Sequence, residues 1–70
     1  MFGSYKDYGR AAYNLRKAVN LNPANPDAHY FLAWAYYRQN DRADAAAELK
    51  KTLALKPYYP GADGLLKSIQ

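Results

Sequence analysis

The chain has 70 residues, which allows one small domain with a core of marginal size. It has no cysteine, which excludes a disulfide framework and a thiolate metal site. The formal net charge of +4 is spread along the chain, which is typical of a solvated surface rather than of a nucleic-acid footprint.

The first predicted helix covers about residues 7–21, which read "DYGRAAYNLRKAVNL". Asp7 stands where an N-cap is expected, although Gly9 weakens the first turn. The helix should end near Asn22, because the residue before a proline is disfavoured in the α region. Residues 1–4 are expected to be only the tail of an earlier helix.

A second helix is predicted to begin at Pro26, as the first member of an antiparallel helix pair over about residues 26–55. Asn25 can accept a hydrogen bond at the helix start, and proline fits the first helical position because its missing N–H would be unpaired there. Asp27 is favourable at the positive end of the helix dipole. Together these residues are a strong signal for a helix start.

The other helix of the pair is predicted over about residues 42–55. Asn40 tolerates the left-handed conformation of a tight turn, and Asp41 is a good N-cap for the alanine-rich segment that follows. A proline again follows the apolar run and ends the helix near Lys56.

The last predicted helix covers about residues 60–69 and begins with proline. It carries Gly61 and Gly64, so it should be the least stable of the four. No segment requires a strand, and residues 1–70 are expected to form a single domain.

An internal repeat relates these segments to one another. Shifting the chain by 34 residues superimposes identical residues that are mostly small, apolar or helix-breaking, the types that set packing and boundaries rather than chemistry. The matched pairs are Asp7 with Asp41, Ala11 with Ala45, Ala12 with Ala46, Leu15 with Leu49, Lys17 with Lys51, Leu21 with Leu55, Pro23 with Pro57, Pro26 with Pro60, Ala28 with Ala62, and Leu32 with Leu66.

This pattern resembles the tetratricopeptide repeat, whose 34-residue unit is a pair of antiparallel helices. Residues 26–59 resemble one whole unit, residues 7–23 the second helix of a preceding unit, and residues 60–70 the first helix of a following one. The resemblance implies an all-α fold of about four helices, a fragment of an α-solenoid that binds other proteins. The residues that carry it are Leu32 and Ala33 at the family's Leu-Gly site, Tyr36 at its first-helix tyrosine, Ala45 and Leu49 at its small and bulky second-helix sites, and Pro57 at its closing proline.

Helical spacing divides the second helix into two faces, since each residue turns the helix by about 100°. One face should meet the third helix as a core; its residues are His29, Leu32, Ala33 and Tyr36, opposite Ala45, Leu49, Thr52 and Leu53. The other face is a predicted partner-binding groove, because the resemblance implies that first helices line a concave surface that holds peptides. Its residues are Asp27, Tyr30, Trp34, Tyr37 and Arg38.

Two interpretations of this aromatic face remain open. The rings can supply rigid apolar area to a peptide or protein partner, while Asp27 and Arg38 fix its orientation by charge-assisted hydrogen bonds. Alternatively, the rings pack against the terminal helices or against another copy of the chain. The first interpretation makes the chain a non-catalytic interaction module. The second makes it a structural, self-associating repeat fragment, natural or designed, without a dedicated ligand.

No residue pattern indicates catalysis, a metal site or a cofactor. His29 is the sole histidine and lies on the predicted core face, where we expect a hydrogen-bonded structural role. Asp41 and Asp44 are better interpreted as helix-start residues than as catalytic acids. The sequence has neither a phosphate-binding glycine loop nor a nucleophile motif. We therefore expect a non-enzyme.

Self-association is expected on the first helix. A repeat unit cannot bury its apolar face alone, so we expect a second copy to cover this one and form a homo-oligomer, with a dimer favoured. The dimer could form by docking of two faces or by exchange of a helix pair. The residues of this predicted face are Ala11, Leu15, Ala18 and Val19.

Nucleic acids and membranes are not expected partners. A related 35-residue repeat family binds RNA, but the 34-residue spacing and the alanine and proline pattern favour the protein-binding family. No apolar run approaches the roughly 18 residues that span a bilayer, and no basic segment followed by an apolar one stands at the start. We therefore expect a cytoplasmic chain without a targeting signal.

Overall fold

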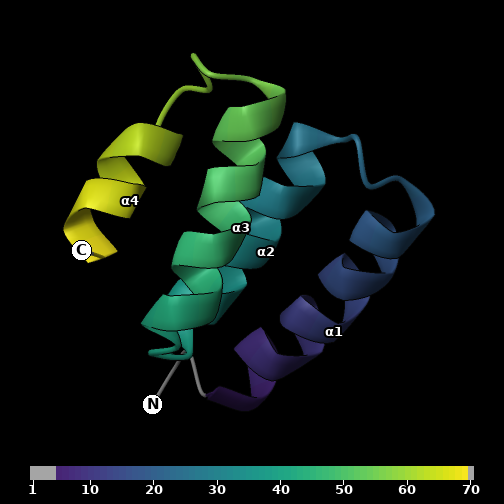
Figure 1. Ribbon diagram of the computed structural model, residues 1–70. Helices are drawn as coiled ribbons and strands as arrows, with labels where there is room; N and C mark the ends of the chain where they lie inside the picture. The colour runs from purple at the N-terminus through teal and green to yellow at the C-terminus, as the bar shows by residue number, and fades with distance from the viewer. Residues whose placement is uncertain (1–4, 70) are drawn as a thin grey trace.

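The computed structural model describes residues 5–69, which form four helices and no strand. The helices are α1 (Tyr5–Leu21), α2 (Pro26–Arg38), α3 (Arg42–Leu55) and α4 (Ala62–Ile69). The central pair is α2 and α3, and α1 and α4 lie on opposite sides of it (Figure 1). The predicted all-α fold of helical hairpins is confirmed. The expectation for residues 1–4 lies outside the described residues.

The starts of α2 and α3 follow the local signals in the sequence. The side chain of Asn25 accepts a hydrogen bond of 3.0 Å from the backbone N–H of Asp27, and Pro26 occupies the first turn. The side chain of Asp41 accepts one of 3.3 Å from the N–H of Asp44. Asn40 has a φ of 65°, the left-handed conformation expected of a tight turn.

Two helix starts differ from the prediction. α1 already includes Tyr5, so Asp7 lies inside the helix and the expectation that it is the N-cap is wrong, since a cap needs non-helical backbone. α4 begins at Ala62 rather than Pro60, because Gly61 has a φ of +86° that no α-helical residue can adopt. The carbonyl of Gly61 instead accepts the N–H of Leu65 at 2.9 Å.

The larger buried cluster joins α2, α3 and α4 into one core. Its most buried residues are Ala33, Ala45, Leu49, Ala62, Leu65 and Ile69. The partly buried side chains of Tyr36 and Leu53 pack against it, as the helical spacing predicted. Small residues at the centre allow the helix backbones to approach closely.

A smaller cluster holds α1 against α2. Its buried residues are Ala12, Leu32 and Ala35, with Ala11, Leu15, Val19 and Tyr36 partly buried around them. This junction therefore buries less side-chain volume than the core on the other side of α2. Among residues 5–69, none of the helices is both long and apolar enough to cross a membrane.

Candidate functional site

An apolar groove of about 480 Å³ runs between α1 and α2. Arg38 is its one charged lining residue, and the other side chains are aromatic, aliphatic or amide groups. The lining residues are Tyr8, Ala11, Asn14, Leu15, Phe31, Trp34, Ala35 and Arg38. An apolar hollow with few polar groups is the kind of surface that proteins use to bind a partner.

The C-terminal half of α2 places an aromatic pair at one wall of this groove. The rings of Trp34 and Tyr37 meet edge to face, with centroids 5.6 Å apart and planes at 82°. The guanidinium of Arg38 lies 5.1 Å from the centre of the Trp34 ring, within cation–π range. These contacts order the indole and hold a positive charge beside it.

The N-terminal half of α2 faces a different neighbour. The ring of Tyr30 lies 4.8 Å from that of Tyr59, in the α3–α4 connection, and Tyr59 donates a short hydrogen bond from its hydroxyl to the carboxylate of Asp27. Burial, followed by this hydrogen bond and the nearby negative charge, raises the pKa of Tyr59 to about 12. Asp27 and Tyr30 therefore help to hold the connection to α4, and neither lines the groove.

The residues of the predicted partner-binding groove therefore lie in two different environments: some line the α1–α2 groove, and others contact Tyr59. Trp34 and Arg38 line the groove, while Tyr37 supports the indole from the side of the larger core. The residues of the predicted self-association face also lie in different places. Ala11 and Leu15 line the same groove as Trp34, whereas Val19 borders another hollow, near His29. The last member of that face, Ala18, is half-buried on α1.

Four lining residues were not singled out from the sequence: Tyr8, Asn14, Phe31 and Ala35. Phe31 carries the largest exposed apolar surface of these, since 52% of it is accessible. The signal that could have found Phe31 and Ala35 is the repeat itself, because the 34-residue shift places them on Leu65 and Ile69, which are core residues.

His29 has the structural role that was expected of it. It is 4% exposed, and its Nδ1 lies 2.8 Å from Glu48 Oε1 while its Nε2 lies 2.8 Å from the carbonyl oxygen of Pro23. Both ring nitrogens therefore lie within hydrogen-bonding distance of an oxygen atom. The ring ties the α1–α2 connection to α3 and has no nitrogen free to act as a catalytic base.

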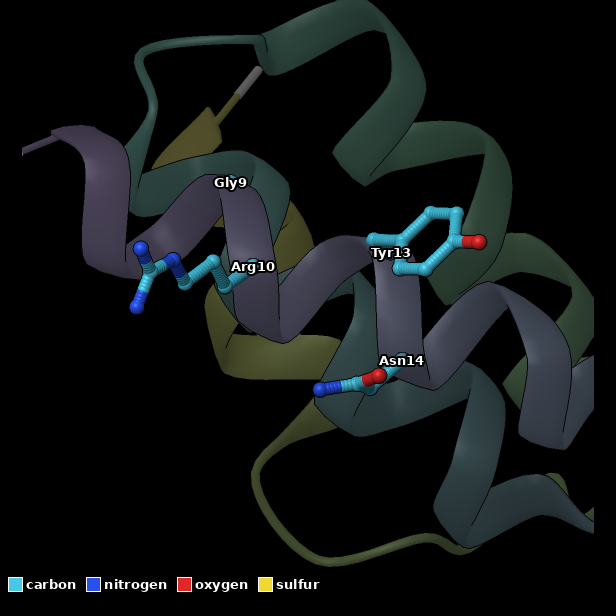
Figure 2. A pocket seen from close by; sticks show the side chains of 4 residues that line it. All are labelled: Gly9, Arg10, Tyr13 and Asn14. Atoms are coloured by element: carbon cyan, nitrogen blue, oxygen red, sulfur yellow. The ribbon is translucent and has the colours of Figure 1, made fainter.

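Neither a second hollow, on α1, nor any cluster of potential metal ligands indicates a further site among the described residues. A hollow of about 550 Å³ is lined by Gly9, Arg10, Tyr13 and Asn14, all on α1. Figure 2 shows that the side chains of Arg10 and Tyr13 point in different directions from this single helix, so they do not converge on a ligand. Within residues 5–69, no group of three or more histidine, cysteine, aspartate or glutamate residues could hold a metal ion.

Comparison with known proteins agrees with this architecture. A family model described as a tetratricopeptide repeat matches residues 4–69. Two curated proteins are each 42% identical over 55 residues: "Putative cellulose synthase operon protein C" of Escherichia coli O157:H7 and "Cellulose synthase operon protein C" of Escherichia coli strain K12. The match covers 79% of this chain but only 5% of the length of each relative. No solved structure matches the chain significantly.

Proposed function

Because the chain belongs to the tetratricopeptide repeat family, whose members are generally non-catalytic protein-interaction modules, we propose that it binds a peptide or partner protein in the α1–α2 groove around Trp34. The groove would carry out recognition only. Trp34 would supply the apolar anchor, and Arg38 would orient an acidic group of the partner.

One observation carries this proposal. The groove joins apolar area from two helices, namely the partly buried Leu15 of α1 with the exposed Phe31 and the partly buried Trp34 of α2, and it has a single charge at its wall. Contiguous apolar surface rimmed by a polar group is typical of an interaction site. The Arg38–Trp34 contact also orders both side chains before a partner arrives, which reduces the entropy lost on binding.

The two relatives support the repeat and nothing more specific. Their names refer to a cellulose synthase operon, but the matched segment is 5% of each protein. We therefore transfer no substrate, enzyme activity or partner from them to this chain.

Self-association remains the alternative, and one observation favours it. Ala11 and Leu15, from the predicted self-association face, line the same groove and are only partly buried by α2. A second copy seated there would bury them. In that case, mass measured by light scattering should rise with protein concentration, and the thermal midpoint should rise with it.

The proposal can be tested with a displayed library of random peptides selected on the protein. Trp34 is the sole tryptophan, so its fluorescence reports directly on the groove. Selected peptides should shift or quench this emission and should lose at least about 1–2 kcal/mol of affinity on Trp34→Ala, as expected for an anchoring aromatic residue. Arg38→Glu provides a second, exposed variant, and it should weaken acidic peptides most.

Peptides that bind both variants as tightly as the original protein would contradict the proposal. So would selected peptides that leave Trp34 emission unchanged and shift the amide signals of other surfaces. A failure of Trp34→Ala to fold would be recognised from its circular dichroism, and Arg38→Glu would then decide the question.

A further inference from the structure

A second groove lies between α1 and α3, with α2 at its back (Figure 1). It consists of two adjoining hollows, of about 520 Å³ and about 270 Å³, which share Val19, Asn20 and Lys51 as lining residues. Neither Trp34 nor Phe31 lines either hollow, so this α1–α3 groove is separate from the α1–α2 groove.

The larger hollow is mainly apolar. Its aliphatic lining comes from Val19 and Pro23 on one side and from Ala54 and Leu55 at the end of α3 on the other, and Leu55 is 43% exposed. His29 also borders this hollow, but both of its ring nitrogens already contact oxygen atoms of the protein. An accessible apolar hollow of this kind suits an aliphatic side chain of a partner.

The smaller hollow has an excess of positive charge. Its lining includes the cations of Arg16 and Lys51 but only one carboxylate, that of Glu48. Both oxygens of this carboxylate are engaged within the protein, since Oε1 lies 2.8 Å from His29 Nδ1 and Oε2 lies 3.4 Å from Lys51 Nζ. Among the side chains that the structure describes, none forms an ion pair with Arg16. Its guanidinium is therefore available to a partner.

Two neutral hydrogen-bond donors lie beside these cations. The amide of Asn20 and the hydroxyl of Tyr36 belong to the lining of the same hollow. Burial, only partly opposed by the nearby charge of Arg16, raises the pKa of Tyr36, so its hydroxyl keeps its proton and stays a donor at neutral pH. Positive charge together with N–H and O–H donors is the arrangement that binds a carboxylate.

From these two hollows we propose that the α1–α3 groove binds a segment of a partner protein in which an aliphatic side chain and a carboxylate lie close together in the chain. The aliphatic side chain enters the larger hollow beside Leu55, and the carboxylate accepts hydrogen bonds from Arg16. Lys51 borders both hollows and adds a second positive charge where they meet. This gives the protein an interaction surface in addition to the groove around Trp34.

Other anionic partners fit this groove less well. Single-stranded nucleic acid needs exposed aromatic rings on which its bases stack, and the rings in this lining, those of His29 and Tyr36, are buried and partly buried. An anionic membrane surface is contacted by protruding apolar side chains, whereas the apolar groups of the larger hollow line a recess. A protein segment can place a side chain in each hollow.

The test begins with a displayed library of octapeptides built from aspartate, glutamate, leucine, valine, serine and glycine, selected on the 70-residue protein. The selected peptides should shift the amide signals of Val19, Asn20 and Lys51, which line both hollows, and leave the fluorescence of Trp34 unchanged. Replacing their aspartates and glutamates with asparagine and glutamine should weaken binding at least about tenfold, because the carboxylate is lost.

Two matched pairs of variants test the two hollows, with binding measured by anisotropy of a labelled peptide at physiological salt. Arg16→Glu should weaken binding at least about tenfold, whereas Lys17→Glu, the same charge change at the next exposed residue, should change it less than about threefold. Leu55→Asp should also weaken binding at least about tenfold, and Leu21→Asp, at the equivalent end of α1 but outside the groove, less than about threefold. Circular dichroism checks that all four variants fold.

Several outcomes would overturn the inference. Equal effects within each pair, or equal binding of the neutral peptides, would remove the α1–α3 groove as the site. Acidic peptides that instead change the fluorescence of Trp34 would overturn it while supporting the proposed function, and a library that yields no binder would overturn it without affecting that function. A single-stranded oligonucleotide or a phosphatidylserine vesicle that binds through Arg16 in the absence of peptide binding would identify another class of partner. A dimer that Leu55→Asp converts to a monomer would place a second copy in the groove.

Discussion

The α3–α4 junction and the α1–α2 junction are built from equivalent repeat positions, yet the first is closed and the second is open. At the closed junction, α2 covers Leu49 and Leu65. At the open junction, no described residue covers Leu15 and Phe31 to the same degree. The difference shows that equivalent apolar positions are buried where a helix lies over them and stay accessible where none of the described helices does.

The largest expected difference between the junctions comes from their equivalent leucines. Leu49 is completely buried, so Leu49→Ala should lower the free energy of unfolding by about 2–5 kcal/mol. Leu15 is only partly buried beside an open groove, so Leu15→Ala should lower it by about 1 kcal/mol or less. Denaturation with urea measures both values. Equal losses would mean that the two junctions are closed to the same extent.

The next largest effect is expected at His29, whose ring joins the connection between α1 and α2 to Glu48 of α3. His29→Ala removes both contacts of the buried ring, the one with Glu48 and the one with the carbonyl oxygen of Pro23, which should cost about 1–3 kcal/mol of unfolding free energy. Lys51→Ala is the matched control, because its exposed ion pair with Glu48 should contribute less than about 1 kcal/mol. Urea denaturation measures both variants, and equal losses would contradict the structural role assigned to the ring.

At the closed junction, substitutions of two glycines at the start of α4 and within it should have opposite effects on stability. Gly61→Ala should destabilise the protein by about 1–2 kcal/mol, because a φ of +86° is unfavourable for alanine and its Cβ would lie 2.9 Å from the hydroxyl oxygen of Tyr30. Gly64→Ala meets no atom within 4 Å and lies inside α4, so it should stabilise by up to about 1 kcal/mol. Thermal unfolding of the two variants should therefore shift in opposite directions.

The smallest expected effect is at the tyrosine that joins α2 to the α3–α4 connection. Tyr59→Phe removes the hydrogen bond to Asp27 and should cost about 0.5–1 kcal/mol, since Asp27 is exposed and water can replace the tyrosine hydroxyl as its partner. The pKa of Tyr59 is raised from 10.0 to about 12, so its contribution is complete below pH 10 and is lost as pH rises through 12. Unfolding of the original protein between pH 8 and 12 should show this loss, and Tyr59→Phe should lack it.

Local sequence rules predicted most of the helix boundaries. The two capping residues, Asn25 and Asp41, and the left-handed Asn40 are set by their own side chains and nearest neighbours, so the sequence is sufficient to place them. The start of α4 was misplaced, because Pro60 fits a helix start, whereas the positive φ of Gly61 is a conformation that glycine allows but that its identity alone does not require.

The candidate site was only partly predictable for a related reason. Helical spacing gives the faces of one helix, but it does not say which neighbouring helix covers each end of a face. Tyr30 and Trp34 share a face in the sequence, yet α4 and its connection engage Tyr30 while α1 and Trp34 form the groove. Phe31 was missed because it lies between the two predicted faces, and only comparison with Leu65 shows its role.

Hydrogen exchange of the free protein tests the difference between the junctions most directly. Backbone amides at residues 11–19 of α1 and at the equivalent residues 45–53 of α3 would be followed by nuclear magnetic resonance. If the α1–α2 junction is open, α1 amides should exchange at least about tenfold faster than their α3 counterparts, a difference of about 1.4 kcal/mol in opening free energy. Equal protection of the two helices would contradict the account.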